Sequence, residues 1–209
     1  NIQINTFGSI EGGKLKKHNT LKKLIKSNST TAVLKACNVL SKGGIIVYPT
    51  DTLYGLGCDS KNEKAIKKLN KIKNRTGPIS VIAPNRKTAI DWMFIKENEK
   101  KTIKNKLKNG NTVITQVKNN ICSNLIVGNE STLGIRIPEH MFCKKLSRLF
   151  PNPITSTSVN RTGEKPLTKP NDILNEFKKD IDLVIDDGII EGDGSKIFLF
   201  TNGFWKQLR

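Results

Sequence analysis

Two closely spaced cations, Lys73 and Arg75, follow the apolar face of a predicted helix and have the chemistry to bind phosphate groups. An arginine makes planar, bidentate contacts with a phosphate, and a lysine acts as a point charge. Cations also stabilise the C-terminus of a helix by interacting with its dipole. Spacing alone does not separate these two interpretations, so phosphate binding is one of two hypotheses for this pair.

A further cation, Arg136, lies between β-branched residues in the segment Gly134 to Pro138, which is typical of a strand. Burial of a guanidinium without a partner costs free energy. Arg136 is therefore expected either to face solvent or to hold an anion such as a carboxylate.

Hydroxyl groups and glycines follow the short apolar run 45–48, which predicts a buried strand. The loop 50–57 would lie at the carboxyl end of that strand, where α/β sheets usually bind ligands. Gly55 and Gly57 would let the backbone approach a ligand closely. An ordinary turn between a strand and a helix explains the same residues, and taken alone it is the simpler interpretation.

A second polar segment, 154–163, carries Ser156, Ser158 and Asn160 at alternate positions. Alternate residues of a strand point to the same face, so these groups would be presented together to a polar ligand. An edge strand with a solvated face is the alternative.

The elements that must position these residues are predicted from hydrophobic periodicity. Apolar spacing predicts helices over 30–41, 63–73, 87–94, 97–108, 140–149 and 171–179. Short β-branched or apolar runs predict strands over 45–48, 79–83, 112–117, 133–137, 153–157, 183–186, 196–200 and 204–208. Asn171 is predicted to cap the last helix. Helices and strands mix without repeats, which indicates an α/β fold with a twisted, mixed parallel and antiparallel sheet flanked by helices.

One catalytic domain is expected over residues 30–209, preceded by a basic segment, 1–29, that is either an N-terminal arm or an edge element of the sheet. The net charge of +18 is typical of a protein with an anionic partner, such as a nucleotide or a nucleic acid. An AT-rich genome, which enriches Lys, Asn and Ile, explains the same charge. Charge alone therefore does not select a function.

Several function classes lose support from missing motifs. The sequence contains no P-loop, no Rossmann glycine motif, no HExxH and no GxSxG. Its 4 cysteines form no CxxC pair and its 2 histidines form no ligand-spaced cluster, so no disulfide framework and no protein-held metal are expected. No apolar run approaches the ~20 residues that span a bilayer, and the first residues lack a signal-peptide pattern. We expect a cytoplasmic protein without membrane contact.

The polar segments, in this order and spacing, resemble the YrdC-like family of threonylcarbamoyl-AMP synthases. The resemblance runs from about Leu40 to the C-terminus and rests on YPTDTLYGLGCD, KNR, GIRIP, STSVNRTG and IDLVIDDG. The combination of PTDTLYGLG with SxNxxG is much more specific than any single segment. The resemblance implies the YrdC-like fold in its single-domain form.

The resemblance also implies a reaction. The family condenses L-threonine, bicarbonate and ATP into threonylcarbamoyl-AMP and pyrophosphate, for the threonylcarbamoyladenosine modification of tRNA. It implies that Mg²⁺ accompanies ATP as substrate, that a threonylcarbamoyl transferase complex acts downstream, and that tRNA is a candidate partner.

Residue roles follow from the resemblance, carried onto matching positions. Lys73 and Arg75 are the implied catalytic residues. The implied ATP-binding residues are Lys73, Arg75, Ser158, Asn160, Pro166 and Arg209. The implied threonine-binding residues are Thr52, Arg136, Ser156 and Ser195. The alternative is an RNA-binding module of the same fold, specific for tRNA or rRNA, that lacks this activity.

Overall fold

The computed structural model describes residues 23–209. The strands are β1 (Leu24–Lys26), β2 (Ile46–Tyr48), β3 (Gly55–Gly57), β4 (Ser80–Ile82), β5 (Thr112–Gln116), β6 (Thr132–Arg136), β7 (Ile154–Ser158), β8 (Leu183–Asp186), β9 (Ile197–Thr201) and β10 (Phe204–Gln207). The helices are α1 (Ala32–Ser41), α2 (Glu63–Lys73), α3 (Arg86–Trp92), α4 (Lys100–Lys106), α5 (Met141–Leu149) and α6 (Pro170–Phe177). Short 3-10 turns cover Glu97–Glu99, Asn124–Ile126 and Asn129–Ser131.

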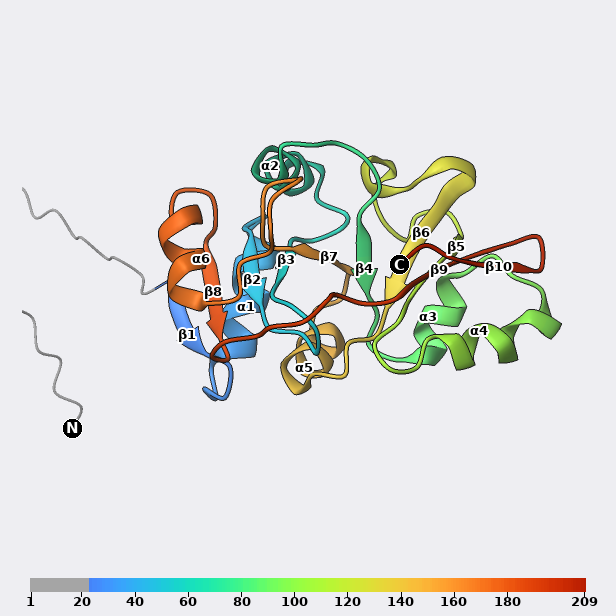
Figure 1. Ribbon diagram of the computed structural model, residues 1–209, viewed down its shortest axis with the longest axis horizontal. Helices are drawn as coiled ribbons and strands as arrows, with labels where there is room; N and C mark the ends of the chain where they lie inside the picture. Colours follow the sequence, from blue (N-terminus) through green and yellow to red (C-terminus); the bar gives the residue numbers. More distant parts are fainter. Residues whose placement is uncertain (1–22) are drawn as a thin grey trace, which may run out of the picture.

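All the described strands join one sheet in the order β1-β8-β2-β3-β7-β4-β6-β5-β9-β10 (Figure 1). The pairs β1–β8, β2–β8, β4–β6 and β5–β9 are parallel, and the others are antiparallel. The expected mixed sheet flanked by helices is therefore confirmed. β1 lies at one edge, inside the segment predicted as arm or edge; the remainder of that segment, up to residue 22, lies outside the described residues.

The core divides between the two faces of the sheet, because side chains of a strand alternate. Ile45 and Val47 belong to a large cluster that includes α2, α3, α4 and α6. Ile46 and Tyr48 belong to a smaller cluster beneath α1 and α5. Ile82 and Ile154 also join the smaller cluster, which therefore extends along this face to β4 and β7.

Tyr48 explains the glycines of β3. Its hydroxyl donates to the carbonyl oxygen of Thr155 at 3.0 Å, so its ring lies across β3. A Cβ on Gly57 would come within 2.6 Å of that ring, and a Cβ on Gly55 within 3.0 Å. The prediction that Gly57 makes room for a ligand is therefore wrong: it makes room for Tyr48.

Several predicted boundaries also need correction. The loop 50–57 ends in the strand β3, which pairs with β2 and β7. β7 lies between β3 and β4, so segment 154–163 does not begin with an edge strand. Asn171 does not cap α6, because Pro170 already occupies the first turn and Lys169 is the cap residue.

Within residues 23–209, no helix has the length and apolar character needed to cross a membrane.

Candidate functional site

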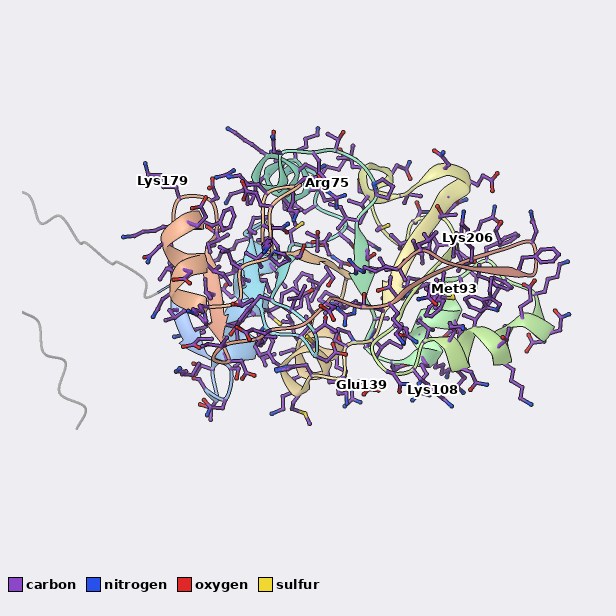
Figure 2. All side chains as sticks on the ribbon, viewed as in Figure 1. Arg75, Met93, Lys108, Glu139, Lys179 and Lys206 are labelled. Atoms are coloured by element: carbon purple, nitrogen blue, oxygen red, sulfur yellow. The ribbon has the colours of Figure 1, made fainter. Side chains whose placement is uncertain are left out.

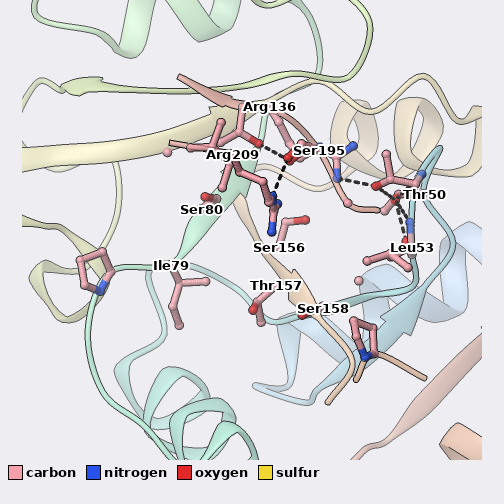
Figure 3. Close-up of a pocket in the computed structure, with 18 of the residues that line it drawn as sticks. Thr50, Leu53, Ile79, Ser80, Arg136, Ser156, Thr157, Ser158, Ser195 and Arg209 are labelled. Atoms are coloured by element: carbon pink, nitrogen blue, oxygen red, sulfur yellow. Dashed lines mark hydrogen bonds between the residues drawn. The ribbon is translucent and has the colours of Figure 1, made fainter. Parts of the chain in front are cut away.

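A cavity of about 1020 Å³ opens on the same face of the sheet as the smaller core cluster (Figure 3), because Ser80 and Ser156 line it two residues from Ile82 and Ile154. Its floor follows the alternation of the central strands. On β6, Thr132, Gly134 and Arg136 line the cavity, while Leu133 and Ile135 point into the large core cluster. Polar and small residues on one face of otherwise apolar strands therefore create the site.

The segment between β8 and β9 borders this cavity and runs in front of the middle strands in Figure 1. A Cβ on Gly192 would lie 2.6 Å from the carbonyl oxygen of Thr52, so the two backbones are in close contact. Ser195 shares a 2.7 Å hydrogen bond with Thr112, and Arg209 Nε donates to the Ser195 carbonyl at 2.9 Å. We call residues 187–196 the strap.

Tyr54 anchors the strap at its start. Its hydroxyl donates to the carbonyl oxygen of Gly188 at 2.7 Å and accepts from the backbone N–H of Asp187 at 2.9 Å. Burial raises the pKa of Tyr54 to about 12, so the hydroxyl keeps its proton. The Tyr54 side chain, which lines the cavity, thus connects the loop after β2 to the strap.

Lys73 is buried at the C-terminus of α2, and its ammonium points to β7. Lys73 Nζ donates to the carbonyl oxygen of Ser158 at 2.8 Å and to Asn160 Oδ1 at 2.6 Å. Asn160 is held in turn, because its Oδ1 accepts from Ser158 Oγ and its Nδ2 donates to the carbonyl oxygen of Glu164. The helix end and the end of β7 therefore form one hydrogen-bonded unit.

Burial is the main cause that lowers the pKa of Lys73 to about 8, and the charge of Arg75 adds to the effect. Arg75 is exposed and lines the same cavity, beyond the αL residue Asn74 that ends α2 (Figure 2). Within residues 23–209, neither Lys73 nor Arg75 forms an ion pair. This end of the cavity therefore carries positive charge that no direct ion pair neutralises, although the carboxylate of Glu164 is near enough to raise the pKa of Lys73 slightly.

Arg136 is also buried, with 7% of its side chain exposed, and it does have a counter-ion. Its Nη2 donates to Asp51 Oδ1 at 2.7 Å, and its Nη1 lies 3.4 Å from Thr52 Oγ1. Its Nε is buried without a hydrogen-bond partner in the described structure. Of the two sequence-based alternatives for Arg136, solvent exposure is wrong, and the anion it meets here is a carboxylate of the chain itself.

The loop that carries Thr52 is shaped by Thr50. The Thr50 hydroxyl donates to the carbonyl oxygen of Leu53 at 2.6 Å and accepts from the N–H groups of Thr52 and Leu53, both at 3.2 Å (Figure 3). A threonine hydroxyl that bonds its neighbours' backbone fixes a tight turn. Thr52 is therefore placed by local hydrogen bonds that the sequence motif already contains.

Every residue expected to bind ATP or threonine lines this one cavity: Thr52, Lys73, Arg75, Arg136, Ser156, Ser158, Asn160, Pro166, Ser195 and Arg209. Others were missed from the sequence, including Ser80, Thr112 and Thr132. The alternation of Thr132, Gly134 and Arg136 along β6 could have indicated Thr132. Asp51 was missed because nothing in the sequence pairs it with Arg136.

The described part of the chain contains no cluster of three or more His, Cys, Asp or Glu side chains that could hold a metal ion. The cavity instead gathers mainly cations, hydroxyls and amide groups, together with the carboxylate of Asp193 from the strap. Such a set can bind anions and orient a polar substrate, and it supplies no nucleophile paired with a base.

The chain is similar in sequence and in structure to several known proteins. Threonylcarbamoyl-AMP synthase of Photobacterium profundum is 31% identical over 156 residues, which cover 71% of this chain and 83% of that protein. The structure of E. coli YciO superposes with a TM-score of 0.79 at 21% identity, covering 89% of this chain and 92% of that one. The structure of P. abyssi Sua5 complexed with L-threonine gives a TM-score of 0.76 at 24% identity, covering 85% and 53%. Residues 38–209 match the Sua5/YciO/YrdC family, which is described as telomere recombination, and the chain therefore belongs to this family.

Proposed function

We propose that this chain is an L-threonylcarbamoyladenylate synthase that makes threonylcarbamoyl-AMP and pyrophosphate from L-threonine, bicarbonate and ATP. One observation carries the proposal: a single cavity holds two cations without ion pairs, Lys73 and Arg75, at one end and, at the other, a buried arginine whose Nη1 makes only one long contact. The relatives named threonylcarbamoyl-AMP synthase support it, because the matches cover 84% and 83% of those proteins.

The chemistry proceeds without a covalent enzyme intermediate. The threonine amine attacks the carbon of bicarbonate and water leaves, which gives N-carboxy-threonine. A carbamate oxygen then attacks the α-phosphorus of ATP, and the bond to pyrophosphate breaks. The protein must hold two anionic reactants together and compensate their charges, which is positioning and electrostatic stabilisation.

At the nucleotide end, Lys73 and Arg75 bind the phosphates and stabilise the charge that develops as pyrophosphate leaves. Asn160 and Ser158 hold Lys73 in place and contact the nucleotide. Pro166 borders the nucleotide, and Arg209 reaches a phosphate from the strap side. All of these residues border the cavity, which is compatible with these roles.

At the amino-acid end, Arg136 binds the α-carboxylate of threonine. Thr52 and Ser156 contact threonine through hydroxyl or backbone groups, and Ser195 closes over it from the strap. The short distance between Thr52 and Arg136 is compatible with one small ligand that contacts both.

ATP would enter with Mg²⁺ held by its own phosphate oxygens and waters, because the residues that face the phosphates are cations. The proposed product is passed to a separate threonylcarbamoyl transferase that modifies tRNA. A cytoplasmic address and direct binding of tRNA remain predictions.

The test is pyrophosphate release from ATP and bicarbonate, with and without L-threonine, followed by mass spectrometry of the nucleotide product. Threonine-dependent release together with the mass of threonylcarbamoyl-AMP is the expected result. Pyrophosphate release with serine but not with threonine would identify serine as the substrate. No release from folded protein would reject the proposed reaction.

The RNA-binding alternative is not favoured. Positive charge alone gives no reason for hydroxyl and amide groups to gather around Lys73 and Arg136 inside a cavity. Under that alternative, RNA affinity would fall steeply with salt in the absence of any ATP turnover.

A further inference from the structure

We propose that Asp51 is a positioning residue for the amino-acid subsite: it holds the Arg136 guanidinium from outside the cavity, so that the remaining donors of Arg136 are aligned for a substrate carboxylate. The proposal rests on the function proposed above, in which Arg136 binds the α-carboxylate of threonine.

The location of the Asp51 carboxylate separates positioning from direct ligand binding. Asp51 and Arg136 form an ion pair at 2.7 Å, with side chains 17% and 7% exposed. Arg136 is among the residues that line the cavity and Asp51 is not. The carboxylate therefore contacts the guanidinium from outside the cavity wall.

The unused donors of Arg136 point to a ligand. A guanidinium has five N–H donors, and Asp51 takes one through Nη2. The contact of Nη1 with Thr52 Oγ1 is long, at 3.4 Å, and Nε is buried without a partner in the described structure. Nε is buried away from the cavity, so the N–H groups left on Nη1 and Nη2 are the donors that a substrate carboxylate would satisfy.

The structure makes room for Asp51 at one specific position. Gly110, in the turn before β5, has φ +63°, and a Cβ there would lie 1.9 Å from Asp51 Oδ2. Gly110 thus favours the turn conformation and leaves space for the carboxylate. Two segments far apart in the sequence are shaped around the same ion pair.

A competing explanation predicts the opposite effect of removing Asp51 on threonine binding. If Asp51 merely occupied the place of the substrate carboxylate, its removal would strengthen threonine binding. If it positions Arg136, its removal weakens threonine binding, because the guanidinium loses its fixed orientation.

The experiment measures L-threonine binding by calorimetry, together with the KM values for threonine and ATP, in the full chain. We expect Asp51→Ala to raise the Kd for threonine about tenfold, the scale of one charge-assisted hydrogen bond. Asp51→Asn keeps an acceptor for Nη2 and should lose less. The KM for ATP should stay unchanged in both. Glu97→Gln, at the exposed Lys100 pair, is the matched control for loss of a carboxylate.

A double-mutant cycle tests whether Asp51 acts through Arg136. In an Arg136→Ala background, Asp51→Ala should have no further effect on threonine binding. Threoninamide, which lacks the α-carboxylate, should be insensitive to Asp51→Asn. Gly110→Ala should weaken threonine binding in the same direction as Asp51→Ala.

Tighter or unchanged threonine binding in the folded Asp51→Asn and Asp51→Ala variants would overturn the proposal. Equal losses for threonine and ATP would also overturn it, because they indicate a general structural role. If the wild-type protein neither binds threonine nor releases pyrophosphate, the proposed function itself fails, and that result is visible before any variant is compared.

Discussion

Lys73 and Arg136 are both buried cations in one cavity, but they are held in different ways. The Lys73 ammonium contacts neutral oxygen atoms of Ser158 and Asn160, and the neighbouring Arg75 is exposed. The Arg136 guanidinium faces the carboxylate of Asp51. The charge of Lys73 is therefore not neutralised by a direct ion pair, whereas the charge of Arg136 is paired with a carboxylate.

The difference matches the two proposed ligands. A triphosphate carries several negative charges and binds best where positive charge is uncompensated. Threonine is a zwitterion with no net charge, so a neutral ion pair with spare donors suits it. The nucleotide end should depend on salt and pH, and the amino-acid end should depend on geometry.

The largest expected effect is at Lys73. Lys73→Met keeps much of the side-chain length and removes the charge, so we expect kcat to fall by about 10² to 10³, the range for loss of one preorganised donor. Pyrophosphate release under saturating substrates measures this effect. A fall of less than threefold in folded protein would remove Lys73 from the catalytic role.

The next effect separates the two ends directly. Arg136→Ala should raise the KM for threonine by about 10- to 100-fold, while Arg75→Ala should raise the KM for ATP, because charged hydrogen bonds contribute on this scale. Steady-state kinetics with each substrate varied in turn provides the measurement. Mild, equal changes in both KM values for both variants would contradict the role assignment.

Tyr54 tests whether the strap belongs to the amino-acid end. Tyr54→Phe removes the hydrogen bonds to Asp187 N–H and the Gly188 carbonyl, two exposed residues, so the free energy of unfolding should fall by about 0.5 to 1.5 kcal/mol. Because the strap carries Ser195 and contacts Thr52, the KM for threonine should rise more than that for ATP. Denaturant titration and kinetics measure the two effects, and a larger change for ATP would place the strap at the other end.

The smallest expected effect is the uptake of about one proton at Lys73 when ATP binds. The pKa of Lys73 lies near 8 in the protein, below its ordinary value of 10.5. Bound phosphates would raise it again, so ATP binding between pH 8 and 9 should take up a proton, and threonine binding should not. Calorimetry in two buffers of different ionisation enthalpy detects the uptake, and Lys73→Met should abolish it.

The same pKa shift affects stability. Between pH 8 and 10.5 the unfolded chain binds more protons at Lys73 than the folded chain does. The contribution of this residue to the free energy of unfolding therefore rises with pH over that interval. The wild type and Lys73→Met should differ in this slope, and identical slopes would mean that Lys73 is not perturbed.

Local patterns in the sequence were sufficient for much of the fold and site. Hydrophobic periodicity predicted α2 and β2 closely, because each element buries its own apolar face. The hydroxyl of Thr50 bonds backbone groups two and three residues away, so the loop shape is local as well. The cations Lys73 and Arg75 lie close together because both are at the C-terminal end of α2.

Tertiary structure alone decided which groups meet. Asp51 pairs with Arg136 across 85 residues, and Lys73 meets Asn160 across 87. Gly57 is required by the ring of Tyr48, and not by a ligand, because the tyrosine crosses β3 to reach Thr155. Sequence alone determines which side chains carry charge and which face of a strand they occupy. Strand order, which depends on packing over the whole sheet, decides whether a buried charge meets a carboxylate or only neutral oxygen atoms.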